Sequence, residues 1–452
     1  MKRNAYHKLV NWKHSDRRKP LILKGARQVG KTWLMNEFAN CEYKNSIYIS
    51  FYKNKPAQSL FEGTIDTRVL LERIALYANT EIVAGKTLLI FDEIQDCPAA
   101  VASLKYFNED ANEQHIISAG SLLGVYLAKN TAFPVGKVNV INIYPMGFDE
   151  FLAVNDEGMY KYFLSVRGES DYVSAFHARM LEWYRKYLII GGMPECVKSW
   201  AEKKDPQEVM DIQKDLLSIY ENDFSQHNNK IPAAKVLTVF RNIIPQLAKE
   251  NTEKFVYRVL REGARGKDYE DAIEWLVTSG IALKVNNLSA PLYPLNAYNQ
   301  DKVFKLFLLD VGLTKYMAGM DNKSIILDEA FSFKGQLVEN YVLQQLVPQM
   351  DFTPNYFAPS REMEIDFIIQ SGTRVVPVEV KSGTSKRAIS FKKYIEKYKP
   401  ETAIRFSSNE YMTNGNVTNI PLYFTGKVME LVAGGTKLCY HERANEGFNV
   451  GL

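Results

Sequence analysis

The chain has 452 residues, of which 46% are hydrophobic and 24% charged, and its formal net charge is +4. This length predicts two to four domains of roughly 100–200 residues each, and the ordinary composition excludes long disordered stretches. The small net charge identifies no partner, although it permits a local basic face for nucleic acid. We expect a cytoplasmic protein without a membrane segment, because no apolar run reaches roughly 20 residues, the start lacks a signal-peptide core and the four cysteines are isolated.

Over residues 1–143, apolar segments of strand length alternate with segments of helical periodicity. A basic amphipathic helix is expected within residues 1–18, strands at 20–26, 46–51, 87–93 and 115–120, and helices at 32–40 and 67–78. Such alternation is typical of the α/β class and predicts a parallel sheet with helices on both faces.

The remaining residues divide into three further regions. Residues 144–230 are predicted to form a helical subdomain, in which GGMP at 191–194 ends a helix. Residues 231–330 combine helices with extended segments at 282–287 and 291–298, a pattern that suggests a winged-helix-like domain. Residues 331–452 form a separate α/β domain with expected strands at 363–370, 374–382 and 402–408.

The segment Gly25–Thr32, GARQVGKT, matches the phosphate-binding pattern GxxxxGK[ST] between an expected strand and an expected helix. Gly25 and Gly30 let the backbone turn its N–H groups toward phosphate oxygens, and the helix directs its positive end at the same anion. Lys31 is expected to reach the β- and γ-phosphates as a catalytic residue, and Thr32 to hold Mg²⁺. The alternative is an ordinary glycine-rich turn.

The second motif is TLLIFDE, an apolar strand that ends in Asp92 and Glu93 about 60 residues after the loop. In a P-loop enzyme this strand lies beside the strand that precedes the loop. Asp92 would complete the Mg²⁺ shell, and Glu93 would orient or deprotonate the attacking water. An acidic pair alone would mark only the end of a strand, but its place after the loop favours the functional interpretation.

Ser121 follows the strand at 115–120 and has two interpretations. Its hydroxyl could sense the γ-phosphate or the attacking water, or it could cap the next helix. The predicted cofactors are ATP and Mg²⁺, and the predicted nucleotide-binding set is Gly25, Ala26, Arg27, Gln28, Val29, Gly30, Lys31, Thr32, Trp33, Asp92 and Ser121.

The C-terminal region carries a second group of candidate residues. If the turn at 370–373 is centred on Ser371 and Gly372, Asp366 lies opposite Pro377 and diagonal to Glu379. Period two then places four polar residues on one face, Glu364, Asp366, Glu379 and Lys381, and four apolar residues toward a core, Ile365, Phe367, Val378 and Val380.

Two carboxylates and an amine in this arrangement can bind a divalent metal and orient a water molecule. Glu339 on the preceding helix would supply a third carboxylate, which gives a predicted metal set of Glu339, Asp366 and Glu379 and a catalytic pair of Glu379 and Lys381. The pattern is that of restriction-type nucleases, PD-(D/E)XK in shorthand. The alternative is a solvated hairpin with cross-strand Glu–Lys pairs.

A basic amphipathic helix follows these strands at 391–400. Its cations could track a phosphate backbone, or they could simply form a solvated face. They are, with two residues before it, Lys386, Arg387, Lys392, Lys393, Lys397 and Lys399.

The chain resembles the prokaryotic AAA-type P-loop ATP-binding proteins that carry a C-terminal domain of unknown function. The resemblance extends over nearly the whole length and rests on an ordered set of motifs: LKGARQVGKT, LLIFDEIQDCP, SAGSLL, YPMGFDEFL, GGMPE, FKLFLLDVGL, GQLVENYV and EIDFII followed by VEVKSG. It implies an AAA-type ATPase core, a small helical subdomain, a winged-helix-like segment and a restriction-endonuclease-like C-terminal domain. It also implies that the C-terminal carboxylates and Lys381 form one site.

One residue departs from the family pattern. Similar proteins often have a Gly-Arg pair before the YPMGFDEFL-type stretch, and here Lys137 takes the place of the arginine. If that arginine acts on the ATP of a neighbouring copy, Lys137 is a weaker substitute because it lacks the planar fork. Arg185 could contact phosphate within the same chain, or it could be a surface arginine.

Two functional hypotheses follow. In the first, the nucleotide state of an ATPase controls a nuclease-like C-terminal domain, and DNA or RNA binds through the C-terminal and winged-helix-like domains. The sequence leaves open whether the chain forms a homo-oligomer. In the second, the chain is a nucleotide-dependent switch or scaffold whose C-terminal domain binds a partner and cuts nothing.

Overall fold

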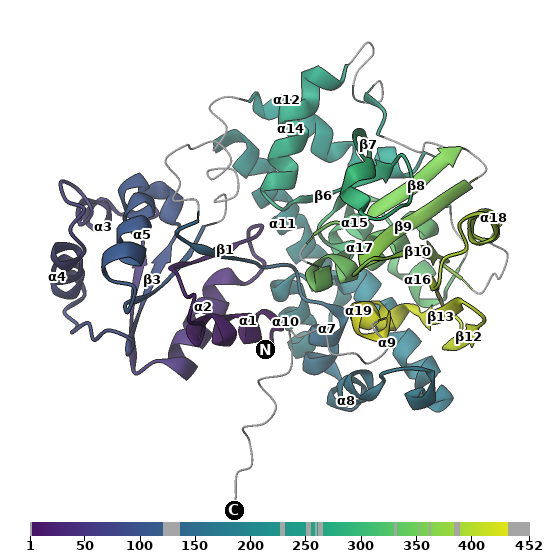
Figure 1. Cartoon of the computed structure of the whole chain (residues 1–452), viewed down its shortest axis with the longest axis horizontal. Coiled ribbons are helices and arrows are strands. Elements are labelled where there is room, and N and C mark those ends of the chain that lie inside the picture. The colour runs from purple at the N-terminus through teal and green to yellow at the C-terminus, as the bar shows by residue number, and fades with distance from the viewer. Residues whose placement is uncertain are drawn as a thin grey trace, which may run out of the picture.

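The computed structural model describes residues 2–120, 136–226, 231–249, 255–257, 260, 265–329, 332–350, 352–360, 363–383 and 389–432. Figure 1 shows a five-stranded sheet with its helices on one side of the molecule and an eight-stranded sheet on the other, with helices between them. Among the described residues, no helix combines the length and the apolar character needed to cross a membrane.

The first sheet is parallel and has the strand order β2-β3-β4-β1-β5. Its strands are β1 (Leu21–Lys24), β2 (Asn45–Ser50), β3 (Thr87–Asp92), β4 (His115–Ala119) and β5 (Asn139–Asn142). The helices around it are α1 (Ala5–Lys13), α2 (Lys31–Glu42), α3 (Lys55–Ser59), α4 (Thr67–Ala78) and α5 (Pro98–Asp110). The predicted parallel α/β sheet is therefore confirmed.

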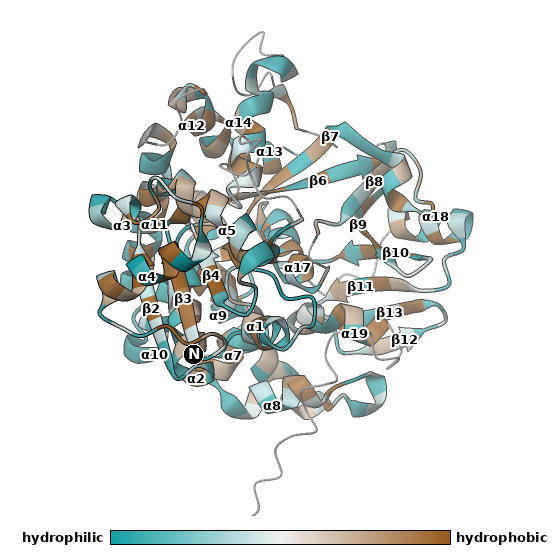
Figure 2. Ribbon diagram, turned by 60° about the vertical axis from the view of Figure 1, so that its left-hand side comes forward, coloured by the Kyte–Doolittle hydropathy of each residue, from teal (hydrophilic) through white to brown (hydrophobic). Residues whose placement is uncertain are grey.

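Helices cover both faces of this sheet because successive strand residues enter two different cores. Leu88 and Ile90 of β3 pack with residues of α1 and α2, whereas Leu89 and Phe91 pack with residues of α4 and α5. Strand β3 is buried along its whole length and is hydrophobic in Figure 2. Period two therefore places Asp92, its last residue, on the α2 side of the sheet.

The expectation that β3 lies beside the strand preceding the phosphate-binding loop is wrong. Strand β4 lies between β1 and β3. The motifs can still meet, because the carboxyl ends of parallel strands share one edge of the sheet in either order.

Ten helices of the described segments lie between and around the sheets and share one hydrophobic core with the α2 side of the first sheet. They are α7 (Phe148–Asn155), α8 (Glu157–Ser165), α9 (His177–Ile190), α10 (Pro194–Lys203), α11 (Pro206–Gln226), α12 (Ala233–Arg241), α13 (Ile243–Leu247), α14 (Gly266–Thr278), α15 (Val311–Met317) and α16 (Asn322–Ile326).

A buried carboxylate joins two of these helices to the helix that carries Gln344. Asp310 accepts hydrogen bonds from the backbone N–H of Gly192 (2.6 Å), from that of Leu313 at the start of α15 (3.1 Å) and from Gln344 Nε2 (2.9 Å). Burial raises the pKa of Asp310, and these hydrogen bonds act in the opposite direction. The end of α9, the start of α15 and the helix that carries Gln344 are thus fixed to one side chain.

The second sheet is mixed and has the order β12-β13-β11-β10-β9-β8-β6-β7. Its strands are β6 (Ala282–Leu288), β7 (Asn299–Leu308), β8 (Asn355–Ser360), β9 (Met363–Ser371), β10 (Arg374–Val380), β11 (Ala403–Ser407), β12 (Met412–Asn414) and β13 (Val417–Pro421), and its helices are α17 (Lys334–Met350), α18 (Ile389–Tyr398) and α19 (Val428–Val432). The antiparallel ribbon β6–β7 joins this sheet through the pairing of Asn287 with Tyr356. The expected extended segment at 291–298 is not a strand, because it ends in a 3₁₀ turn at Leu295–Tyr298.

The predicted register of the β9–β10 hairpin is wrong by two residues. Val378 pairs with Phe367 and Arg374 with Ser371, so the turn residues are Gly372 and Thr373. One further step in this register sets Asp366 opposite Glu379 rather than opposite Pro377. A shift of two residues keeps every side chain on its predicted face, and the four apolar residues expected in a core are all buried.

Gly191 is a test of the Asp310 junction. It caps α9 with φ +77° and ψ −170°, a region that is nearly exclusive to glycine, and a Cβ there would lie 2.2 Å from Asp310 Oδ1. We expect Gly191→Ala to lower the free energy of unfolding by about 2–4 kcal/mol, measured by denaturant titration. Gly319→Ala is the matched control, because Gly319 has φ +63° but no atom within 4 Å of the added Cβ, so it should cost only about 1 kcal/mol. Equal losses for the two variants would contradict the packing argument.

Candidate functional site

The loop between β1 and α2 is shaped by close packing and by left-handed backbone. A Cβ on Gly25 would lie 2.2 Å from the carbonyl oxygen of Ile143, so glycine is required there. Gly30 caps α2 with φ +92°, and Gln28 has φ +62°, an unfavourable value for a residue with a side chain. The loop therefore curves tightly ahead of a 12-residue helix whose N-terminal N–H groups point toward it.

The side chain of Lys31 folds back onto this loop. Its Nζ donates hydrogen bonds to the carbonyl oxygens of Gly25 (2.8 Å) and Ala26 (2.7 Å). Burial lowers the pKa of Lys31 to about 8, while the nearby charges of Glu93 and Asp92 act in the opposite direction. The ammonium group is thus held by neutral backbone oxygens at the loop.

Three donors converge on the carboxylate of Asp92. Thr32 Oγ1 donates to Oδ2 at 2.9 Å, the Tyr48 hydroxyl donates to the same oxygen at 2.6 Å, and the Glu93 N–H donates to Oδ1 at 2.9 Å. Asp92 is buried, with 6% of its surface exposed. The structure therefore brings together Thr32 and Asp92, the two residues predicted to hold Mg²⁺.

Glu93 follows Asp92 in left-handed backbone with φ +49° and begins a short 3₁₀ turn, Ile94–Asp96. Its Oε2 accepts a hydrogen bond from Gln95 Nε2 at 2.6 Å. The turn places this second carboxylate at the carboxyl edge of the sheet beside Asp92, and Glu93 is half-buried there.

The loop is also tied to segments far away in sequence. Arg27 forms an ion pair with Asp223 of α11, and its carbonyl oxygen accepts a hydrogen bond from the Tyr220 hydroxyl at 3.0 Å. On the other side, Arg3 Nη1 donates to the carbonyl oxygen of Val29 at 2.9 Å. Movement of the loop would therefore change its contacts with α11.

The other predicted residues have different outcomes. Ser121 lies outside the described residues, and Trp33 is partly buried against the core. Lys137 forms an ion pair with Glu109 (2.8 Å) and Arg185 with Asp328 (3.4 Å), so both cations are engaged within the chain.

The C-terminal carboxylates lie close together, but an ammonium group lies among them. Lys305 Nζ, from β7, is 2.5 Å from Glu364 Oε1 and 3.9 Å from Glu339 Oε2. Burial alone would lower the pKa of Lys305, but Glu339 and Glu364 outweigh it and hold the pKa above its ordinary value. Lys305 therefore stays charged, and a residue outside the predicted C-terminal set neutralises part of the cluster.

The remaining pair of carboxylates is also engaged. Lys381 forms an ion pair with Glu379, and Asp366 Oδ2 accepts a hydrogen bond from the Val380 N–H at 2.6 Å. Burial, and then the neighbouring charge of Glu379, raise the pKa of Asp366 well above its ordinary value. In the described part of the chain, no three His, Cys, Asp or Glu side chains are arranged to hold a metal ion.

Three residues of these sites were not identified from the sequence. Tyr48 lies between Ile47 and Ile49, and Lys305 between Phe304 and Leu306, and this apolar flanking is the only signal that they carry. Asp223 carries no such signal, because it is one of several acidic residues in α11 and its partner is 196 positions away.

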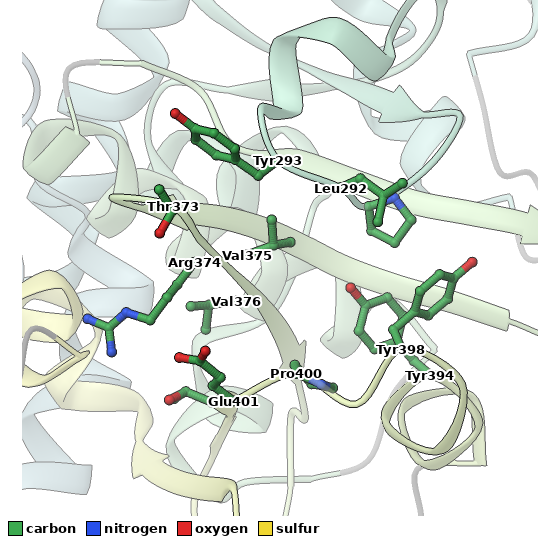
Figure 3. A pocket seen from close by; sticks show the side chains of 12 residues that line it. Leu292, Tyr293, Thr373, Arg374, Val375, Val376, Tyr394, Tyr398, Pro400 and Glu401 are labelled. Carbon is green, nitrogen blue, oxygen red and sulfur yellow. The ribbon is translucent and has the colours of Figure 1, made fainter.

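A pocket of about 260 Å³ lies between the segment at 291–293, the start of β10 and the end of α18 (Figure 3). It is bordered by Leu292 and Tyr293 on one side, by Arg374 and Glu401 on another and by Tyr398 of α18. None of the predicted site residues lines it.

Three family models match successive parts of the chain. An AAA domain matches residues 17–152, a domain of unknown function (DUF8612) matches residues 181–324, and a domain of unknown function (DUF4143) matches residues 334–424. No curated protein matches the chain significantly.

Several solved structures are similar to the chain at low identity. They include the Aeropyrum pernix Orc1 protein in complex with DNA (TM-score 0.26, 10% identity, 70% of this chain and 92% of that chain). A second is Pyrobaculum aerophilum Cdc6p (TM-score 0.23, 11% identity, 71% of this chain and 91% of that chain). A third is the Thermotoga maritima RuvB Holliday junction branch migration motor (TM-score 0.28, 12% identity, 72% of this chain and 91% of that chain). The family matches and the parallel first sheet identify the domains of this chain. The chain therefore carries an AAA domain at residues 17–152, whose parallel sheet and phosphate-binding loop have the P-loop arrangement, and a DUF4143 domain at residues 334–424.

Proposed function

We propose that the chain binds ATP with Mg²⁺ at the loop 25–32, hydrolyses it, and transmits the nucleotide state to its C-terminal part. The observation that carries the proposal is the hydrogen bond between Thr32 Oγ1 and Asp92 Oδ2 at 2.9 Å. It joins the last residue of the loop pattern to the acidic end of β3, which is the pairing that P-loop chemistry needs.

The residues at this point suit Mg²⁺. The ion prefers oxygen ligands and keeps several water molecules, so one hydroxyl and one carboxylate are a sufficient protein contribution. Thr32 and Asp92 would hold it. When bound, Mg²⁺ neutralises charge on the β- and γ-phosphates.

The residues of the chain supply the other requirements of hydrolysis. The curved loop and the start of α2 present N–H groups to the phosphates. Lys31 exchanges its backbone partners for phosphate oxygens, which gain more from its charge than neutral carbonyl oxygens do. Glu93 orients a water molecule and accepts its proton.

The contacts of Arg27 support transmission of the nucleotide state. Phosphate bound in the loop competes for the guanidinium that pairs with Asp223, and the Tyr220 hydroxyl ties the same loop residue to α11. For the division of the chain, we propose an ATPase core at residues 1–143, a helical subdomain at 144–230, a winged-helix-like domain at 231–330 and a nuclease-like domain at 331–452.

The pKa of Lys31 leads to a pH prediction. Phosphate favours the charged amine, so binding raises the pKa of Lys31 from about 8, and a proton must be taken up where the free amine is neutral. Nucleotide affinity should be flat below pH 8 and about tenfold lower near pH 9. Calorimetry in buffers of different ionisation enthalpy should show proton uptake near pH 9, and Lys31→Arg should abolish that uptake. Equal affinity on both sides of pH 8 would contradict the role given to Lys31.

Two substitutions separate binding from hydrolysis. Glu93→Gln keeps the shape of the side chain and removes the base, so we expect unchanged nucleotide binding and a rate of hydrolysis lower by about 100-fold or more. Lys31→Ala should weaken binding by at least about tenfold. Glu62→Gln, at an exposed position of the same domain, is the control. Hydrolysis by Glu93→Gln at the parent rate would exclude Glu93 as the base.

The C-terminal region supports a second candidate function, a partner-binding module that does not cut nucleic acid. The specific observation is the ammonium group of Lys305 beside Glu364 and Glu339. It supplies positive charge where a nuclease would need a divalent cation. The four exposed lysines of the α18 segment, at 392, 393, 397 and 399, leave nucleic acid open as the partner.

Cleavage assays distinguish the two candidates. With Mg²⁺ or Mn²⁺ and a panel of single- and double-stranded DNA and RNA, we expect the wild-type chain to release no more product than Asp366→Asn. The Lys31→Ala background removes any contribution of the ATP site. Metal-dependent cleavage that is lost in the folded Asp366→Asn variant would restore the nuclease interpretation.

A further inference from the structure

Tyr48 lies in the edge strand of the first sheet, outside the two sequence motifs of the site. In the pairing of β2 with β3, Tyr48 lies beside Ile90, and Ser50, two residues later, lies beside Asp92. Tyr48 is therefore a diagonal neighbour of Asp92 on the α2 side of the sheet. The residue is 44% exposed, but its hydroxyl lies 2.6 Å from Asp92 Oδ2.

We propose that Tyr48 is a positioning residue for metal binding, which holds the Asp92 carboxylate in the orientation that the nucleotide-bound metal requires. The inference rests on the proposed function. Oδ2 receives hydrogen bonds from both Tyr48 and Thr32, and Oδ1 receives one from the Glu93 N–H. The three bonds fix the rotation of the carboxylate about its last bond before any ion arrives.

The phenol is suited to this role because it is a neutral donor on a rigid ring. It adds no charge that would compete with the metal, unlike an arginine or a lysine at the same position. A hydrogen-bonding residue behind a ligating carboxylate commonly changes metal affinity or activity by 10–100-fold when it is removed. Without the Tyr48 hydroxyl, the carboxylate would rely on Thr32 alone at Oδ2, and the Thr32 oxygen is itself needed for the ion.

A second tyrosine that follows β2 provides a matched comparison. Tyr52 is similarly exposed, at 47%, and lies four residues further along the chain. Its ring contacts Lys53 rather than the carboxylate. Removal of its hydroxyl changes the surface chemistry equally and leaves Asp92 untouched.

The experiment measures Mn²⁺ uptake rather than turnover. Wild type, Tyr48→Phe and Tyr52→Phe are titrated with Mn²⁺ in the presence of a non-hydrolysable ATP analogue, and free Mn²⁺ is read by electron paramagnetic resonance. Nucleotide affinity is measured separately in EDTA. We expect Tyr48→Phe to bind Mn²⁺ about tenfold more weakly, Tyr52→Phe to match wild type, and all three to bind the nucleotide equally in EDTA.

The outcomes separate this inference from the proposed function. If Tyr48→Phe and wild type give the same Mn²⁺ curve, the inference is overturned and the ATPase proposal stands. If Tyr48→Phe weakens binding equally with and without metal, or only lowers the melting temperature, Tyr48 is structural and the inference is again overturned. If wild type takes up no Mn²⁺ with the analogue, the proposed function itself fails and the inference falls with it.

Discussion

The Thr32–Asp92 hydrogen bond is the contact on which the N-terminal site depends. It can form only because two conditions are met: α2 begins directly after the curved loop, and β3 ends at the same edge of the sheet as β1. Close packing fixes the first condition, since the Ile143 carbonyl leaves no room for a side chain at residue 25. Parallel strand direction fixes the second, so the site survives the insertion of β4 between β1 and β3.

Local patterns predicted the first sheet well. The strands at β1, β2, β3 and β4 and the helices α2 and α4 lie within a few residues of their expected places, because apolar runs of strand length and helical periodicity are determined by nearby residues. Strand order was not predictable in this way, because it depends on which apolar faces pack together. The hairpin turn lies one residue later than predicted, which shifts the register by two, since either Ser371-Gly372 or Gly372-Thr373 satisfies turn chemistry and the sheet decides between them.

The loop and the acidic pair were recognisable because their spacing along the chain is fixed by their chemistry. Tyr48, Asp223 and Lys305 were not, because each acts across a long sequence separation on a partner that only the fold identifies. Lys305 is the clearest example of a contact that the sequence does not reveal. Three carboxylates and Lys381 suggest a metal centre when considered alone, and an ammonium group from a preceding ribbon changes the charge of the whole cluster.

The continuity of the eight-stranded sheet has a practical consequence for work on fragments. Strand β6 lies against β8, so a fragment that starts near residue 330 would expose the β8 edge. An uncovered edge strand invites pairing with other chains and aggregation. Insolubility of such a fragment would therefore reflect the missing strand β6 rather than an inability of the DUF4143 domain to fold. An expression boundary ahead of Ala282 would keep the β8 edge covered.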